Sequence, residues 1–166
     1  LGFARNFQQR TGRYGNIITL TTEHKAVLEP LRQLKKEGFS ITELNPESDG
    51  LILEKNLLNA LREDTFLISI MLANNEIGVV QPIEKIFKIC QKNNIKFHTD
   101  AAQCLGYLSI KNFDSLANMI TLSSHKIYGP KGIGLLIIDE DIQLNPLLYG
   151  GGQEFGYRSG TLPLPL

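Results

Sequence analysis

The stretch TFLISIMLANNEIGVVQPIEKIFKICQKNNIKFHTD, residues 65–100, contains a complete strand–helix–strand pattern. Residues 65–72 form an apolar run rich in β-branched side chains, which predicts a fully buried strand. A polar turn at residues 73–82 leads into a helix whose apolar face is formed by Ile83, Ile86, Phe87 and Cys90. A second strand is predicted at residues 95–99. Strands that alternate with helices in this way are typical of α/β domains with a largely parallel sheet.

The same alternation continues on both sides of this stretch. Further strands are predicted at residues 16–20, 39–44, 118–122 and 132–139. Helices are predicted at residues 23–38 and 53–64, the first with Thr22 as its N-cap and Gly38 as its stop. The pattern therefore predicts a three-layer α/β/α fold with a mostly parallel sheet. Residues 149–166 are rich in glycine and proline and are expected to form a loop.

Composition excludes several classes of protein. The chain has 166 residues, which suits one domain, and its 17 basic and 17 acidic residues leave no net charge. No electrostatic field therefore recruits nucleic acid or an anionic membrane, and no apolar run approaches the roughly 20 residues of a membrane span. Cys90 and Cys104 make no disulfide framework, which favours a reducing compartment.

Polar side chains follow the predicted strands at the points where they end. These residues are Glu23, His24, Asn74, Asn75, Glu76, Asp100, Gln103, Ser123, Ser124, His125 and Lys126. Because ligands of parallel α/β sheets bind outside the carboxyl ends of the strands, the clustering predicts a binding site at that edge.

Lys126 is the residue in this set with the most specific chemistry. An amine with a pKa near ~10.4 is a poor nucleophile, but burial and a neighbouring cation such as His125 make it suitable for a Schiff base. A carbonyl cofactor such as pyridoxal phosphate also needs an acid at its ring nitrogen, for which Asp100 is the candidate. Ser123 and the glycine-rich turn can supply phosphate donors. A lone lysine in a loop is more often simply exposed to solvent. The hypothesis of a Schiff-base lysine therefore depends on the residues near it, His125, Asp100 and Ser123.

Other sites are less favoured. GPKGIG lacks the glycine spacing and the terminal Lys-Ser/Thr of a nucleotide-binding P-loop. His98 lies inside a strand and is expected to pack beside Asp100 rather than bind a metal, and no metal site is expected. Cys90 and Cys104 are both expected in the core, Cys104 near the start of a helix that includes Gln103.

Five segments that contain these residues resemble the motifs of one protein family. TEHKAVLE (22–29), NNEIGVVQ (74–81), HTDAAQ (98–103), SSHKIYGPKGIG (123–134) and GGGQEFGYRSGTLP (150–163) resemble motifs of the cysteine desulfurases. These are pyridoxal-phosphate enzymes of the class V aminotransferase group, with fold type I, and the chain is most similar to the group that serves iron–sulfur cluster assembly. The resemblance implies that residues 1–166 form part of the large cofactor-binding domain.

The resemblance also implies roles for the matching residues. Lys126 would form the Schiff base with the cofactor and move the substrate α-proton, and His24 would stack on its ring. Asp100 would pair with the ring nitrogen, Gln103 with the phenolic oxygen, and Asn75 with that oxygen or the substrate carboxylate. Ser123 and His125 would bind the phosphate. Thr161 would reach the phosphate in a partner subunit, which implies a homodimer. Phe155 stands where the family usually has arginine, which puts one local contact in doubt.

The implied reaction converts L-cysteine to L-alanine and passes sulfur, through an enzyme persulfide, to an iron–sulfur scaffold or another acceptor. We expect a cytoplasmic location, or an organelle matrix if the source is eukaryotic. The chain is expected to lack the family's small domain, its N-terminal phosphate-loop segment and its nucleophilic cysteine, and so to be inactive alone. Two alternatives stay open: a non-catalytic truncated cofactor-binding fragment, and a selenocysteine lyase-like enzyme.

Overall fold

A computed structural model describes residues 1–108 and 115–161 of the chain. The strands of its main sheet are β1 (Asn16–Leu20), β2 (Ser40–Leu44), β3 (Thr65–Ser69), β6 (Lys96–Asp100), β7 (Met119–Ser123) and β8 (Gly134–Ile138). The helices are α1 (Gly2–Thr11), α2 (Lys25–Glu37), α3 (Glu54–Ala60) and α4 (Ile83–Lys92). A small hairpin is formed by β4 (Ala73–Asn74) and β5 (Val79–Val80).

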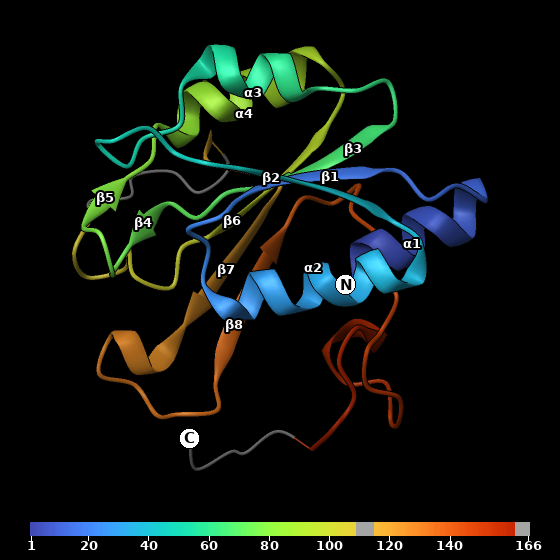
Figure 1. Cartoon of the computed structure of the whole chain (residues 1–166). Coiled ribbons are helices and arrows are strands. Elements are labelled where there is room, and N and C mark those ends of the chain that lie inside the picture. The colour runs from blue at the N-terminus through green and yellow to red at the C-terminus, as the bar shows by residue number, and fades with distance from the viewer. Residues whose placement is uncertain (109–114, 162–166) are drawn as a thin grey trace.

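The six-stranded main sheet has the order β2-β1-β3-β6-β7-β8. Its first five strands in that order run parallel, and only β8 pairs antiparallel, with Ile138 opposite Met119. Helices α3 and α4 cover one face of the sheet, and α1 and α2 cover the other (Figure 1). The predicted three-layer fold with a mostly parallel sheet is therefore confirmed.

Buried strands with two covered faces explain the continuous apolar runs of the sequence. Successive strand residues point to opposite faces, so Ile17 packs into the cluster beneath α1 and α2, while Ile18 packs beneath α3 and α4. Leu67 and Ile68 in β3 divide in the same way. Both faces thus need apolar side chains, as expected for a parallel sheet between two helical layers.

Helix α1 was not predicted from the sequence, because its apolar residues are few. Its packing depends on aromatic contacts: the rings of Phe7 and Phe66 stack with their centroids 3.9 Å apart. Arg5 also forms a two-pronged ion pair with Glu37 of α2, with Nη2 donating to Oε1 at 2.6 Å and Nε to Oε2 at 3.0 Å. These contacts fix α1 beside α2 on one face of the sheet.

Two local predictions were wrong. The N-cap of α2 is His24 rather than Thr22: the His24 Nδ1 atom accepts a hydrogen bond from the Ala26 amide at 3.1 Å. Gln103 lies in a turn rather than at a helix start, and Cys104 accepts the Leu108 amide through its carbonyl.

Pro30 lies inside α2, which continues through it. The final loop is irregular apart from a short helix, η3 (Glu154–Gly156), and its residues 162–166 lie outside the described part.

No helix in residues 1–108 and 115–161 is long and apolar enough to cross a bilayer.

Candidate active site

Except for Thr161, the predicted site residues follow strands that end at one edge of the sheet. Strands β1, β3, β6 and β7 are parallel neighbours, so the segments that follow them leave from the same edge. His24 begins the segment into α2, Asp100 is the last residue of β6, and Ser123 is the last residue of β7. Lys126 and His125 belong to η2 (Ser124–Lys126), which follows β7 directly. The topology thus brings together residues from distant parts of the sequence.

Asp100 is held rigidly at the end of β6. The residue is buried, and its Oδ1 atom accepts a hydrogen bond from the Ala102 amide at 2.9 Å. The next amide, that of Ala101, donates to the Thr121 carbonyl of β7 at 2.9 Å. A buried carboxylate at a strand end is the kind of group that can hold a proton on a bound ring nitrogen.

His98 lies beneath this edge and joins three strands. Its Nδ1 atom lies 2.8 Å from the Ser69 hydroxyl of β3, and its Nε2 atom lies 2.9 Å from the Thr121 hydroxyl of β7. Burial, assisted by the positive charge of the N-terminus, lowers the pKa of His98 to about 4. The ring is neutral at physiological pH, and these contacts hold it between β3 and β7.

The loop that carries Lys126 is closed by its own hydrogen bonds. The Ser123 hydroxyl lies 2.8 Å from His125 Nδ1, and the Ser124 hydroxyl donates to the Pro130 carbonyl. The Gly129 amide donates to the Ser124 carbonyl at 2.9 Å. A Cβ atom at Gly129 would lie 2.9 Å from Ser124 Cβ, so this tight return requires glycine. The loop leaves Lys126 partly buried and His125 exposed.

The two asparagines that follow β3 have different environments. The Asn74 side chain is buried: its Nδ2 atom donates to the Thr22 carbonyl at 2.7 Å, and its Oδ1 atom accepts the Glu76 amide at 2.8 Å. Asn75 is exposed, and Gln103 is partly buried in the turn after β6. Asn75 is therefore the accessible amide of the pair, whereas Asn74 shapes the loop.

Glu23 makes a contact that sequence reasoning missed. The residue stands beside His24 and is buried, with Oε1 accepting the Met71 amide at 2.6 Å. From the sequence, Glu23 is only one of several polar residues at the strand ends. Its one distinguishing feature is its position immediately before the N-cap of a helix. An acid at such a position usually points into solvent, so nothing in the sequence indicates its burial.

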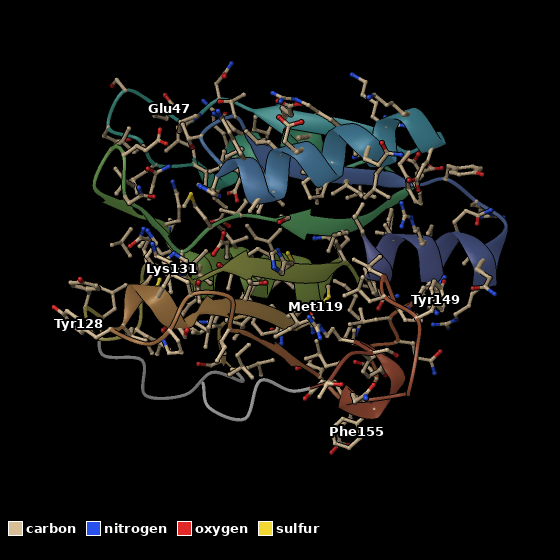
Figure 2. All side chains as sticks on the ribbon, turned by 90° about the horizontal axis from the view of Figure 1, so that it is seen from below. Glu47, Met119, Tyr128, Lys131, Tyr149 and Phe155 are labelled. Atoms are coloured by element: carbon tan, nitrogen blue, oxygen red, sulfur yellow. The ribbon has the colours of Figure 1, made fainter. Side chains whose placement is uncertain are left out.

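Thr161 follows Gly160, whose amide donates to Gln153 in the same segment as Phe155. Strand β8 runs antiparallel to β7, so it carries the chain back toward the opposite edge of the sheet. Figure 2 shows Tyr128 and Lys131 at one end of the molecule and Tyr149 and Phe155 at the other. Phe155 is 97% exposed and Thr161 is also exposed.

Neither cysteine is an exposed thiol. Cys90 and Cys104 are both fully buried, which confirms that they belong to the core. Burial raises the pKa of each thiol to about 12, and the charge of Asp100 adds to the effect at Cys104. Within the described residues, no group of three or more His, Cys, Asp or Glu side chains could hold a metal ion.

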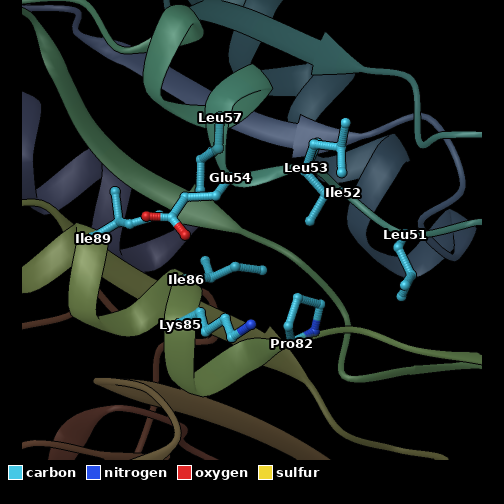
Figure 3. A pocket seen from close by; sticks show the side chains of 9 residues that line it. All are labelled: Leu51, Ile52, Leu53, Glu54, Leu57, Pro82, Lys85, Ile86 and Ile89. Atoms are coloured by element: carbon cyan, nitrogen blue, oxygen red, sulfur yellow. The ribbon is translucent and has the colours of Figure 1, made fainter.

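A cavity of about 300 Å³ lies elsewhere, between α3 and α4. Its lining is mainly apolar, and Figure 3 shows Glu54 and Lys85 on opposite sides of it. The cavity lies on a helical face rather than at the strand ends, so it does not belong to the candidate active site.

The donor set at the strand ends fits pyridoxal phosphate. It combines a partly buried amine, a buried carboxyl on the neighbouring strand, an imidazole at a helix start and hydroxyls in a tight loop. Each matches a different part of that cofactor: its aldehyde, ring nitrogen, ring face and phosphate.

Fold and site together define an α/β protein with a lysine at the carboxyl edge of its sheet. The chain belongs to the aminotransferase class-V family, whose model matches residues 3–163. It is 50% identical to cysteine desulfurase IscS of Pasteurella multocida, over 97% of this chain and 40% of that protein. It is 52% identical to the mitochondrial cysteine desulfurase of Saccharomyces cerevisiae, over 96% of this chain and 32% of that protein.

Solved structures give the same relationship. A structure titled "SspA in complex with cysteine" matches with a TM-score of 0.90 and 44% identity, over 99% of this chain and 48% of that one. A structure titled "NifS-like protein" matches with a TM-score of 0.92 and 39% identity, over 99% and 45% of the two chains. The chain therefore spans less than half the length of these relatives.

Proposed function

We propose that the protein to which this chain belongs is a pyridoxal-phosphate-dependent cysteine desulfurase. The observation that carries the proposal is the placement of Asp100 at the end of β6 and of Lys126 in η2, directly after the neighbouring parallel strand β7. Relatives named cysteine desulfurase, about half identical over nearly the whole chain, support the same activity. Because the chain spans 40% or less of these relatives, the activity is proposed for the whole protein.

Each side chain has a proposed task. Bound pyridoxal phosphate would supply an electron sink for the substrate α-carbon. The Lys126 amine would hold the cofactor aldehyde and move a proton at the substrate α-carbon. Asp100 would keep the ring nitrogen protonated, because a buried carboxylate next to a cation favours the charged pair. His24 would cover the ring face.

The remaining contacts are orienting ones. Gln103 would donate to the phenolic oxygen, and Asn75 to that oxygen or the substrate carboxylate. Ser123 and His125 would bind the phosphate, with the hydroxyl and the ring already 2.8 Å apart. Thr161 would serve the cofactor of a second copy in a homodimer.

Substrate, partners and place in the cell are proposed in the same way. L-cysteine is favoured by the structural relative whose title names it, and the sulfur would pass to an iron–sulfur scaffold or another acceptor. The bacterial and mitochondrial relatives favour the cytoplasm or an organelle matrix. Residues 1–166 would act as one part of the cofactor-binding domain.

The test is formation of L-alanine from L-cysteine by the native protein that contains this chain. We expect turnover that requires added pyridoxal phosphate and is lost in Lys126→Ala. A selenocysteine lyase would instead release alanine from L-selenocysteine with little product from L-cysteine. Alanine formation that persists in Lys126→Ala would contradict the proposal.

A further inference from the structure

Two hydrogen bonds join the turn between β1 and α2 to the segment that follows β3. The Met71 amide donates to Glu23 Oε1 at 2.6 Å. The Asn74 side chain donates to the Thr22 carbonyl at 2.7 Å. His24 follows immediately and caps α2 by accepting the Ala26 amide on Nδ1. The position of the His24 ring therefore depends on this turn, and the turn is held by Met71 and Asn74 from the segment after β3.

Glu23 is an unusual residue for this purpose. Its side chain is 5% exposed, and its Oε2 atom has no hydrogen-bond partner within the described part of the chain. Burying a charged carboxylate with an unpaired oxygen is costly, whereas protonation removes the charge and still leaves Oε1 to accept the Met71 amide. The neutral form therefore fits this environment better than the charged form.

We propose that Glu23 is a positioning residue that fixes His24 at the carboxyl edge of the sheet by holding the Met71 amide with a neutral carboxyl. The inference rests on the proposed function, because His24 matters as the residue that covers the cofactor ring. Removing the Glu23 carboxyl would make the turn more mobile. The hydrogen bond by which His24 caps α2 would then weaken.

Electrostatics at this edge agree with the geometry. Burial raises the pKa of Glu23 to about 8, the Met71 hydrogen bond opposes that shift, and the charge of Asp100 on β6 adds to it. Burial, assisted by the charge of Asp100, also raises the pKa of the Cys104 thiol to about 12, so this thiol carries no charge at neutral pH.

Glu23→Gln and Glu23→Ala separate this role from a purely structural one. Glutamine keeps a neutral carbonyl oxygen for the Met71 amide, while alanine removes it. Glu76→Ala is the matched control, because Glu76 is an exposed glutamate in the loop at the same edge. Glu23→Asp, which withdraws the carboxyl by a methylene, replaces the alanine variant if that variant does not fold.

The measurement is amide hydrogen exchange of the protein without cofactor, read at Met71 and at Ala26. We expect both amides to lose protection at least tenfold in Glu23→Ala and to keep it in Glu23→Gln and Glu76→Ala. Loss at Ala26 is the decisive readout, since that amide reports the His24 cap and not Glu23 itself. Unchanged exchange at Ala26 in Glu23→Ala, or equal loss in Glu23→Gln, would overturn the proposal.

Binding of pyridoxal phosphate, followed by its visible absorbance, adds a second readout. Glu23→Ala should weaken binding about tenfold, and Glu23→Gln should recover most of that loss. Equal binding by wild type and Glu23→Ala would count against the positioning role. Failure of the wild-type protein to bind the cofactor at all would instead contradict the proposed function, while hydrogen exchange would still decide the role of Glu23.

Discussion

Glu23 and His98 show how burial changes the charge of single side chains at the carboxyl edge. His98 loses its charge because its ring is buried between hydroxyls of β3 and β7. Glu23 is buried with one hydrogen bond, from the Met71 amide, and burial raises the pKa of its carboxyl to about 8. Burial thus favours the neutral form of both groups, although one is a base and the other an acid.

The cysteines allow a test at the same scale. With a pKa of about 12, the thiols of Cys90 and Cys104 are ionised to roughly one part in ten thousand at pH 8. Both should therefore react very slowly with a disulfide reagent in the folded protein and rapidly in denaturant. Absorbance of the released thiolate measures both rates. Fast, stoichiometric labelling of native Cys104 would show an accessible thiol and contradict its assignment to the core.

At the scale of elements, the strands could be predicted because burial on two faces leaves long apolar runs. The boundaries of β1 were predicted at the residues observed, and those of β7 within a residue. Helix α1 could not be predicted in this way, since its stability comes from aromatic and ionic contacts with residues far along the chain, Phe66 and Glu37. Local patterns contain no information about such partners.

The candidate site was predictable in part for a related reason. Parallel strands place their carboxyl ends at one edge, so Asp100, Ser123 and Lys126 could be grouped before the fold was known. The capping role of His24 could not, because imidazole is rarely an N-cap and Thr22 has the more usual side chain. The specific roles of Asn75 and Gln103 depend on family resemblance and remain predictions.

The contacts of His98 with β3 and β7 predict a pH-dependent stability. Its pKa of about 4 in the folded chain lies below the value near ~6.5 of an unfolded histidine. The unfolded chain therefore binds the proton first, and the stabilising contribution present above about pH 6.5 is lost as the pH falls toward 4. The loss should be of the order of 2–3 kcal/mol.

Denaturant unfolding of wild type and His98→Gln at pH 7, 5.5 and 4 measures this contribution. We expect the free energy of unfolding of the wild type to fall more steeply on acidification than that of the variant. Subtracting the two curves removes the opposite trend of Glu23, whose raised pKa favours stability at low pH. Parallel curves would show that His98 is protonated in the folded state as readily as in the unfolded one.

For the whole molecule, the sheet separates two kinds of surface. Helices bury its faces (Figure 1). The edge where β1, β3, β6 and β7 end is left to loops, which carry polar and titratable side chains. The antiparallel strand β8 directs the chain after Lys126 away from that edge. The proposed function therefore depends on one property of this edge: that it holds pyridoxal phosphate on Lys126.

Borohydride trapping tests that claim most directly. The protein is incubated with pyridoxal phosphate, reduced, digested and mapped by mass spectrometry. We predict one major modified residue, Lys126, and its loss in Lys126→Ala, with Lys131→Ala as the matched control because that exposed lysine lies in the same loop. An adduct on Lys131 or another lysine that persists unchanged in Lys126→Ala would contradict the account.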